Sequence, residues 1–565
     1  MKCRYLPFLA LLTGVLLSCE KKQFLDQTQT TDLTEEAVFS DSSRTVAFLN
    51  NIYTSIAISA NPVRFGNGGL DASSDEAEPQ KSANITTSVQ FATGTVNAAI
   101  ITDDAWRTAY SNIRSVNQLI KHIPRTPMQA ADKIRLVAEA RFLRAWYYAI
   151  LLKHYGGVPL VGDTIFTMAD KIPAQRSTFD ECVKYIVAEC DKAAKDLPVV
   201  RIRQDYGRVG AGACLALKAR VLLYAASPLF NGGNIAAGNS YTGYTNEDPE
   251  RWKLAADAAR AVIGLNAYSL YVDNATAPGY GFYKVFTLRV NNEYIFARMQ
   301  GGNRDLETYW QPPSRGGGQG GFPYQQLVDA FEMANGKAIT DPASGYDPNN
   351  PYANRDPRMN YSIIHDQSML IQKTGVKELV NIYLGPNGKG VSQDAVHAGT
   401  PTGYYINKML ADNISANNIH GTDRCLPLMR YAEVLLNFAE ATNEYAGPVA
   451  DVYTAVELIR QRAGLNPYQL PQGLDKNAMR EVIRHERRVE LAYEEHRFWD
   501  VRRWKIAAQT ENQVMNGMEI TRDGNKVTYK VFAVRKHNFR EPMYLWPIPQ
   551  SETAKSPELQ QNPGY

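Results

Sequence analysis

The chain of 565 residues has 44% hydrophobic and 21% charged residues, a composition typical of a globular protein with ample core. Its length suits one large domain or two to four smaller ones. The formal net charge of +3 provides no basic field for nucleic acid and indicates a neutral partner. Beyond the N-terminus, no run of about 18 apolar residues occurs, which excludes a membrane-spanning helix.

The N-terminus has the pattern of a secretory leader. A basic head precedes an apolar stretch over residues 6–17, which is too short to cross a hydrocarbon core of about 30 Å. The stretch ends just before Cys19, an arrangement that resembles the bacterial lipobox, in which the cysteine thiol is acylated and becomes the new N-terminus. We therefore predict a lipoprotein signal peptide over residues 1–18, lipid attachment at Cys19 and a tether over residues 19–33. The alternative is an ordinary signal peptide followed by an incidental cysteine.

From residue 34 onward, most of the chain shows apolar residues at spacings of three and four, which indicates amphipathic helices. The clearest pattern covers residues 130–155 and ends at Gly156, a residue that tolerates the left-handed conformation of a helix C-cap. Small residues such as Ala255 and Ala432 favour close contact between helices in tetratricopeptide-like pairs, with a generic helical bundle as the alternative. The other predicted helices cover residues 34–56, 103–120, 177–197, 212–230, 248–265, 428–445, 449–463 and 475–505.

Residues 268–425 differ from the rest of the chain, because they are rich in Gly, Pro, Asn and aromatic residues and have few long periodic segments. Short strands are predicted at residues 292–297 and 404–406, and a glycine-rich loop at residues 312–321. Long ordered loops in a compact domain are usually functional. The predicted fold class is mainly α, a tetratricopeptide-like helical-pair scaffold with a long irregular loop-rich region carrying a few short strands.

The sequence contains no motif that supports catalysis, a cofactor or a metal site. Glycines at residues 316–321 match a dinucleotide fingerprint literally, but no strand precedes them. The acidic cluster at residues 73–78 is interpreted as a solvated loop or the rim of a pocket, rather than a catalytic pair. Cys182 and Cys190 lie on one predicted helix, too far apart for a disulfide. We expect no metal and no cofactor, with buried structural cysteines at Cys182, Cys190, Cys214 and Cys425.

The Arg/Glu-rich run over residues 480–503 has an apolar stripe and is predicted to be a structural helix rather than a nucleic-acid arm. Pairs of opposite charge lie three residues apart, which places their side chains on neighbouring positions of one helix face. We therefore predict local pairing of Arg487 with Glu490 and of Glu494 with Arg497.

Many short segments, in order along the mature chain, together resemble the SusD/RagB family of outer-membrane nutrient-binding lipoproteins. The resemblance implies a single domain over residues 34–565. Its helical scaffold would cover about 34–267 and 426–510, and its loop-rich ligand face about 60–100 and 268–425. Trp106 and Trp499 would then be core residues. The segments that carry the resemblance are residues 106–113, 138–145, 155–160, 217–224, 430–436, 486–491, 497–500, 546–549 and 561–565.

The resemblance also implies a function and partners. Such proteins capture oligosaccharides at the surface of Bacteroidetes cells and pass them to a SusC-like TonB-dependent β-barrel transporter, on which they sit as a lid. We therefore predict a glycan-binding lipoprotein without enzymatic activity, anchored in the outer membrane through its N-terminal lipid and facing the cell exterior. The alternatives are a secreted carbohydrate-active hydrolase, a RagB-like peptide-binding lipoprotein and, third, a structural or adhesion protein.

Sugar rings stack their C–H faces on aromatic side chains, and their hydroxyl groups bind amides, carboxylates and guanidinium groups. The loop-rich segments concentrate these residue types. Trp310 is the best single candidate, because a Gly- and Pro-rich loop can present its ring edge-out. The alternative is a tryptophan that pins the loop to the core. The further candidates are Tyr309, Tyr404, Phe65, Asn67, Asp71, Asp75, Arg355 and Arg358.

Overall fold

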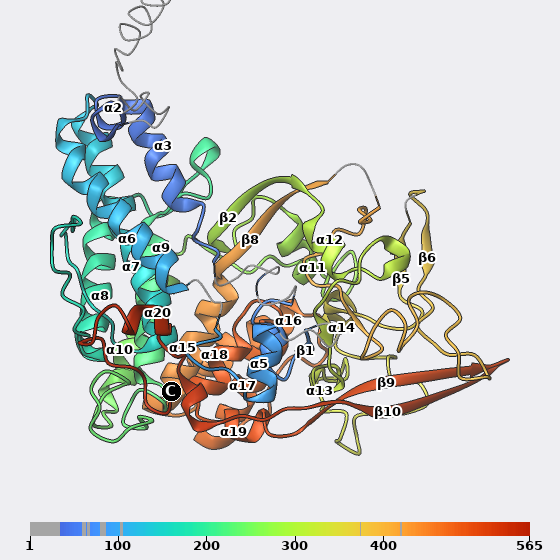
Figure 1. Cartoon of the computed structure of the whole chain (residues 1–565). Coiled ribbons are helices and arrows are strands. Elements are labelled where there is room, and N and C mark those ends of the chain that lie inside the picture. The colour runs from blue at the N-terminus through green and yellow to red at the C-terminus, as the bar shows by residue number, and fades with distance from the viewer. Residues whose placement is uncertain are drawn as a thin grey trace, which may run out of the picture.

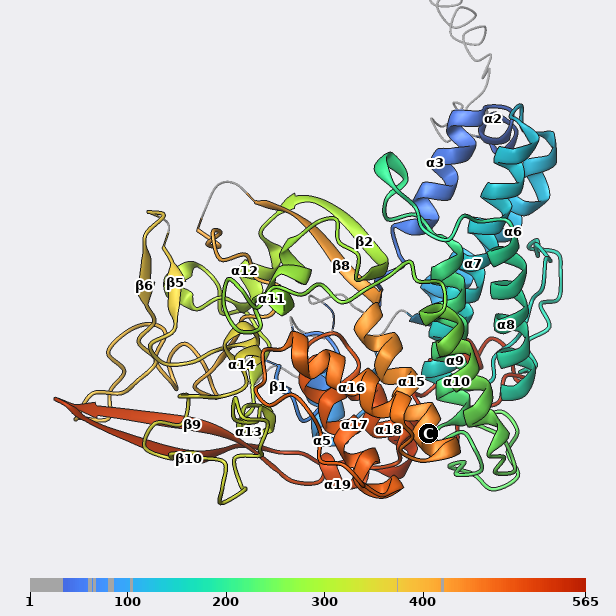
Figure 2. The same ribbon diagram turned by 180° about the vertical axis from the view of Figure 1, so that it is seen from behind.

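The computed structural model describes residues 34–58, 64, 68–79, 86–101, 105–372, 374–417 and 421–565. The predicted signal peptide, the tether with Cys19, and the candidates Phe65 and Asn67 lie outside the described residues. As predicted, the fold is mainly α-helical: long helices gather on one side of the molecule, and loops with small sheets form the other (Figure 1 and Figure 2). In the described part of the chain, no helix is both long and apolar enough to span a bilayer.

Helices that follow one another in the chain pack against one another in turn, from α6 through α7, α8 and α9 to α10. Local signals set their ends. Thr178 and Glu181 form a capping box at the start of α8, and Gly156, with φ of 79°, ends α7 as predicted. The N-terminal helices are α2 Glu35–Phe39, α3 Ser42–Tyr53, α5 Thr87–Thr93, α6 Ala105–His122, α7 Ala130–Tyr155, α8 Phe179–Lys195, α9 Ala211–Ala226 and α10 Glu250–Ile263.

The helical stack continues across the loop-rich region, because α10 packs directly against α15 although residues 264–430 separate them in the chain. Ala259 of α10 and Ala432 and Ala439 of α15 are buried, and such small side chains let two helices approach closely. α15 then packs against both α16 and α17. The C-terminal helices are α15 Tyr431–Ala446, α16 Ala450–Arg462, α17 Lys476–Glu490, α18 Arg497–Arg503, α19 Ala507–Thr510 and α20 Gln550–Thr553.

The predicted helix over residues 475–505 is two helices, α17 and α18, joined by a buried turn. Within the turn, Tyr493 and Glu495 have positive φ values of 60° and 67°. The sequence prediction missed this turn because no glycine or proline marks it and the amphipathic pattern runs through it. The turn brings residues 491–497 against residues 71–76, which come from the other end of the chain.

The loop-rich half contains antiparallel strand pairs, β1 with β3, β2 with β8, β4 with β7 and β5 with β6. β2 and β7 confirm the strands predicted at residues 292–297 and 404–406. The strands are β1 Ala77–Glu78, β2 Tyr294–Asn303, β3 Phe322–Pro323, β4 Ile363–Ile364, β5 Met369–Ile371, β6 Lys377–Leu379, β7 Tyr405–Ile406 and β8 Thr422–Arg430. The short helices are α11 Tyr280–Thr287, α12 Asp305–Trp310, α13 Gln325–Ala330 and α14 Pro357–Ser362.

A long hairpin of β9 (Val514–Asp523) and β10 (Lys526–Lys536) extends away from the body of the molecule (Figure 1). It was not predicted from the sequence, although polar and apolar residues alternate over residues 526–530. β9 lies against the loops at Leu384, whose amide donates to the Ile520 carbonyl at 2.7 Å, and at Thr402, where a Cβ on Gly517 would come within 2.5 Å of the Thr402 carbonyl oxygen. A side chain at this position would therefore separate the hairpin from the loop-rich half.

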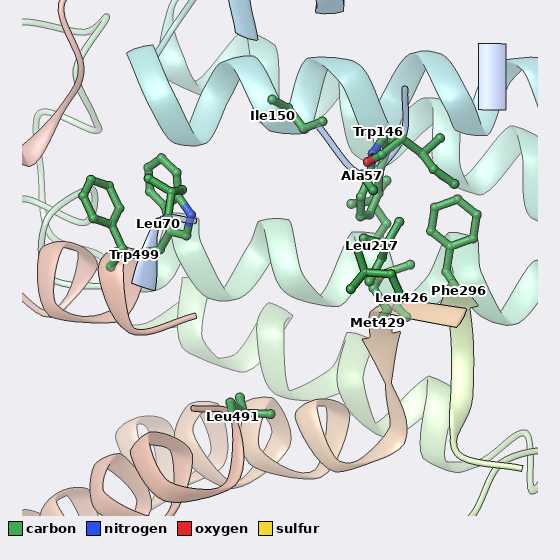
Figure 3. Close-up of a cluster of buried hydrophobic side chains, with 14 of the residues drawn as sticks. Ala57, Leu70, Trp146, Ile150, Leu217, Phe296, Leu426, Met429, Leu491 and Trp499 are labelled. Carbon is green, nitrogen blue, oxygen red and sulfur yellow. The ribbon is translucent and has the colours of Figure 1, made fainter. Parts of the chain in front are cut away.

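The helical scaffold and the loop-rich half share one hydrophobic core. Figure 3 shows Trp146 of α7 and Leu217 of α9 converging with Phe296 of β2 and Met429 of β8. The rings of Trp146 and Phe296 meet edge to face, with centroids 5.2 Å apart. The β2–β8 ladder is therefore fixed to the scaffold through its buried side chains, and it carries the loops that lead out of it.

Two predictions about buried residues are confirmed. Trp106 and Trp499 are core residues, 7% and 3% exposed. The four cysteines within the described residues are free and buried, and Cys182 and Cys190 lie on α8 as predicted. Burial raises the pKa of the Cys182 thiol to about 12, so this thiol stays protonated and chemically inert near neutral pH.

Candidate functional site

The structure brings together two of the loop segments in which candidates were predicted, residues 68–79 and 309–323. β1 pairs with β3, so that Ala77 lies opposite Pro323, and the Gly321 amide donates a hydrogen bond to the Pro79 carbonyl at 3.2 Å. A Cβ on Gly321 would lie 3.3 Å from Trp310 Nε1 and 3.6 Å from the Gly68 Cα atom. The two segments therefore pack together within the loop-rich half: residues 68–79 are all buried, and the accessible residues of the pair lie within 309–319.

Trp310 does not present its ring to solvent, so the edge-out orientation predicted for it is wrong. It ends α12, is only 5% exposed and belongs to the hydrophobic core. The glycine-rich loop folds back over this helix end, where Gly317 approaches so closely that a Cβ would lie 2.1 Å from the Gln311 carbonyl oxygen. Ser314 anchors the same loop by donating a hydrogen bond to Asp394 at 2.5 Å. Local composition predicted the loop correctly, but the loop covers the tryptophan instead of displaying it.

Tyr309 and Tyr404 differ in their access to solvent. Tyr309 is half-buried, and its carbonyl accepts a hydrogen bond from the amide of exposed Gln319 at 3.0 Å. Tyr404 is fully buried, and its hydroxyl donates to the side chain of Gln325 at 2.7 Å. The structure therefore contradicts the exposure expected of Tyr404. It leaves Tyr309, beside the amide of Gln319, as a partly accessible aromatic side chain; Gln319 was not predicted.

Asp71 and Asp75 are buried rather than lining an open pocket, so the interpretation of residues 73–78 as a solvated loop or pocket rim is wrong. Asp75 binds Arg497 at 2.7 Å and Arg488 at 2.9 Å. Burial opposes ionisation of Asp75, but these two guanidinium groups outweigh it and hold its pKa well below its usual value. Among the described residues, no arginine pairs with Asp71 in this way, and burial together with the charge of Glu495 raises its pKa to about 7. These carboxyl groups fasten the segment to the turn between α17 and α18.

Arg358 and Arg355 are also internal, which corrects their prediction as ligand-binding residues. Arg358 is 1% exposed and binds Asp356, Glu486 and Glu490 at 2.8, 2.5 and 3.0 Å. Arg355 donates to the backbone carbonyls of Val328, Phe331 and Pro351. The hydrogen bonds that both guanidinium groups make are to groups of the protein itself, where they hold the fold together.

In the charged run over residues 480–503, the local pairs predicted for Arg487 with Glu490 and for Glu494 with Arg497 are wrong. Arg487 binds Asp500, and Glu494 binds Arg430 at 2.6 Å. Glu490 is fully buried and contacts the guanidinium groups of three arginines from different parts of the chain, Arg358, Arg430 and Arg462. Buried charges require nearly complete pairing, and only tertiary structure can supply that many partners.

Comparisons with known proteins agree with this architecture. The chain matches the family model described as "SusD family" over residues 283–565, half of its length. The chain belongs to the SusD family. A second model, described as "Starch-binding associating with outer membrane", matches residues 23–223.

Among SusD-family relatives, "SusD-like protein P2" of Formosa agariphila is 24% identical over 480 residues, covering 81% of this chain and 80% of the relative. A solved SusD-like protein from Bacteroides fragilis NCTC 9343 has a TM-score of 0.78 at 28% identity, covering 94% of this chain and 99% of that one. "Surface glycan-binding protein A" from Bacteroides fluxus has a TM-score of 0.61 at 21% identity, covering 93% and 99%. The SusD fold thus extends over nearly the whole chain.

In this SusD-family chain, the described residues contain no group of three or more His, Cys, Asp or Glu side chains that is arranged to hold a metal ion. Of the buried acidic residues in 71–78, Asp75 is paired with Arg488 and Arg497, and Glu78 with Arg535. The accessible chemistry of residues 309–323 consists of a tyrosine ring and a carboxamide, which suits recognition of hydroxyl-rich, uncharged groups.

Proposed function

We propose that this protein is a cell-surface glycan-binding lipoprotein, which captures oligosaccharides without turnover and delivers them to a SusC-like TonB-dependent transporter. The single observation that carries the proposal is the partly accessible ring of Tyr309 together with the exposed Gln319 on the loop-rich half. Family membership supports it, as does the printed name of the Bacteroides fluxus neighbour, a surface glycan-binding protein. No cofactor takes part in this function.

Purified protein is expected to bind oligosaccharides and release no product. Incubation with a panel of oligosaccharides, followed by calorimetry and a reducing-end assay, checks both halves of this prediction. No product is expected because Asp71 and Asp75 are held in the interior and do not form an accessible acid–base pair. Binding without new reducing ends would therefore support a binding protein. New reducing ends would instead identify a carbohydrate-active hydrolase. Binding of peptides alone would identify a RagB-like peptide-binding protein.

A Cys19→Ala variant is expected to leave the membrane fraction or to remain unprocessed, because the proposed lipid is attached through this thiol. Acyl chains contribute about 0.8 kcal/mol per buried CH₂ group, so several chains anchor a protein stably. Cell fractionation and mass spectrometry of the N-terminus measure the effect, and Cys3→Ala, within the predicted signal peptide, is the matched control. A mature, membrane-bound Cys19→Ala protein would refute the lipid anchor.

Extraction in mild detergent is expected to recover the protein together with a large β-barrel transporter. A stable complex of this kind needs an interface of at least about 1,000 Å² in total. Affinity purification of the full-length lipoprotein from its own membranes, followed by mass spectrometry, tests the pairing. Recovery of the protein alone, under conditions that keep other outer-membrane complexes intact, would argue against the delivery role.

A further inference from the structure

A cleft lies on the loop-rich half, lined by none of the residues 68–79 and 309–323. It is an open cleft of about 700 Å³, within the range of about 300–1,000 Å³ typical of small-molecule sites. One wall lies beside α11 and α14, which pack side by side (Figure 1 and Figure 2). We propose that this cleft is a second binding site, for a neutral oligosaccharide. Its lining includes Pro278, Asn335, Ser344, Asn354, Tyr361 and Asn466.

The wall of the cleft contains a fixed aromatic ring. Tyr361 is half-buried, and one face of its ring stacks on Tyr283, with centroids 5.7 Å apart and an interplanar angle of 22°. Its hydroxyl points to the Pro278 carbonyl oxygen at 3.4 Å, and Tyr280 packs against its edge. The ring is therefore held in place before any ligand arrives. In the proposed complex, the C–H face of a sugar ring stacks on the other face of this ring.

Hydrogen bonds within the protein hold the floor of the cleft together. Arg355, 5% exposed, donates hydrogen bonds to the carbonyl oxygens of Val328, Phe331 and Pro351 at 2.6, 2.6 and 2.7 Å. Backbone hydrogen bonds then connect the three segments of the floor, from the Ala334 amide to the Asn354 carbonyl and from the Asn466 amide to the Ala334 carbonyl. Because these bonds form within the protein, a ligand does not have to order the floor when it binds.

The polar groups that remain for a ligand are amides. Asn354 and Asn466 are exposed, and within the described part of the chain their side chains make no hydrogen bond. Asn360 uses its Oδ1 atom toward His365 Nε2 at 3.1 Å, which leaves its NH₂ group for another partner. A carboxamide offers a donor and an acceptor in one plane, which matches the paired hydroxyl groups of a sugar.

The charge of the lining selects against ionic ligands. Arg355 is the one charged residue among the described residues that line the cleft, and its guanidinium group is committed to backbone carbonyls. An anionic sugar would lose the hydration of its charge without gaining a counter-charge. A peptide would lose the hydration of its charged termini and side chains in the same way. A neutral oligosaccharide carries no such cost. The inference rests on the proposed glycan-binding function and adds a second site to it.

The test uses the full-length protein with neutral gluco-, manno- and xylo-oligosaccharides as probes, and an oligogalacturonate and an unrelated peptide as comparisons. Calorimetry measures binding to the wild type, Tyr361→Ala, Tyr361→Phe and the matched control Tyr445→Ala, which removes an exposed tyrosine of α15. If Tyr361→Ala does not fold, Ala277→Trp replaces it as the test variant, because a tryptophan at this position fills the cleft without removing a contact. Hydrogen exchange then locates the bound sugar.

Tyr361→Ala is expected to weaken one binding event about 30-fold, as loss of an aromatic anchor does, whereas Tyr361→Phe and Tyr445→Ala bind as the wild type. The sugar should protect residues 333–361 and 464–466 from exchange. If the sugar protected only residues 309–323 from exchange and Tyr361→Ala bound it with wild-type affinity, the second site would be overturned but the proposed function would remain intact. If the cleft bound the oligogalacturonate or the peptide more tightly, the assignment of a neutral oligosaccharide as its ligand would be overturned. Binding of no oligosaccharide would overturn both proposals.

Discussion

A Trp310→Ala variant is expected to lose about 3–5 kcal/mol of unfolding free energy, the usual cost of truncating a buried tryptophan. The side chain lies in the core at the end of α12, where the glycine-rich loop covers it. Its removal leaves a cavity between this loop and the β1–β3 pair, because Gly321 lies next to the indole and has no side chain to fill the space. A urea titration followed by circular dichroism measures the loss.

Trp310→Phe is the control, because it keeps a ring in the core and removes an indole N–H that has no hydrogen-bond partner within the described residues. Its cost should be clearly smaller than that of alanine. Tyr309→Ala should behave in the opposite way, with weaker glycan binding and little change in stability. If Trp310→Ala kept the wild-type midpoint and lost ligand affinity, the tryptophan would be a stacking platform after all.

Glu490→Ala is expected to destabilise the protein by about 3–5 kcal/mol, because the substitution breaks a buried charge network by removing its centre. Glu490 contacts Arg358, Arg430 and Arg462, all of them buried. Without the carboxylate, three buried positive charges lose a negative partner that offsets the cost of removing them from water. The free energy of unfolding near neutral pH, from urea titration, measures the effect.

Glu481→Ala provides a matched comparison on the same helix, since Glu481 is 71% exposed and pairs with Arg484 one turn away. Exposed pairs of this type contribute little, so this variant should unfold within about 0.5 kcal/mol of the wild type. Equal stability of the two variants would show that burial gives Glu490 no special role.

Local patterns predicted the helices well, because each depends on nearby residues. The period over residues 130–155 and the glycine that follows are sufficient to define α7, and alternation at residues 292–297 is sufficient to locate part of β2. The turn at residues 491–496 was missed, because it is stabilised by residues 71–76 rather than by its own sequence.

The candidate site was harder to predict than the fold, because accessibility is a property of the assembled chain. Composition identified residues 312–321 as a loop but did not reveal that the loop covers Trp310. Charge spacing placed Glu490 in a helix, but its partner Arg358 lies 132 residues away in the sequence. Tyr361 was not a candidate, because nothing near it in the sequence indicates the stacked Tyr283 or the open cleft.

The direct packing of α10 against α15 places the two ends of the intervening region, residues 264–430, close together in space. Closing a long loop costs only about 0.6 kcal/mol more for each doubling of its length. Insertions and deletions within this region are therefore inexpensive as long as the helical stack and the β2–β8 ladder remain. Single loops within this region can therefore change in length, in evolution or by engineering, while the residues that fix the region to the rest of the fold, such as Arg358 at Glu490, stay in place.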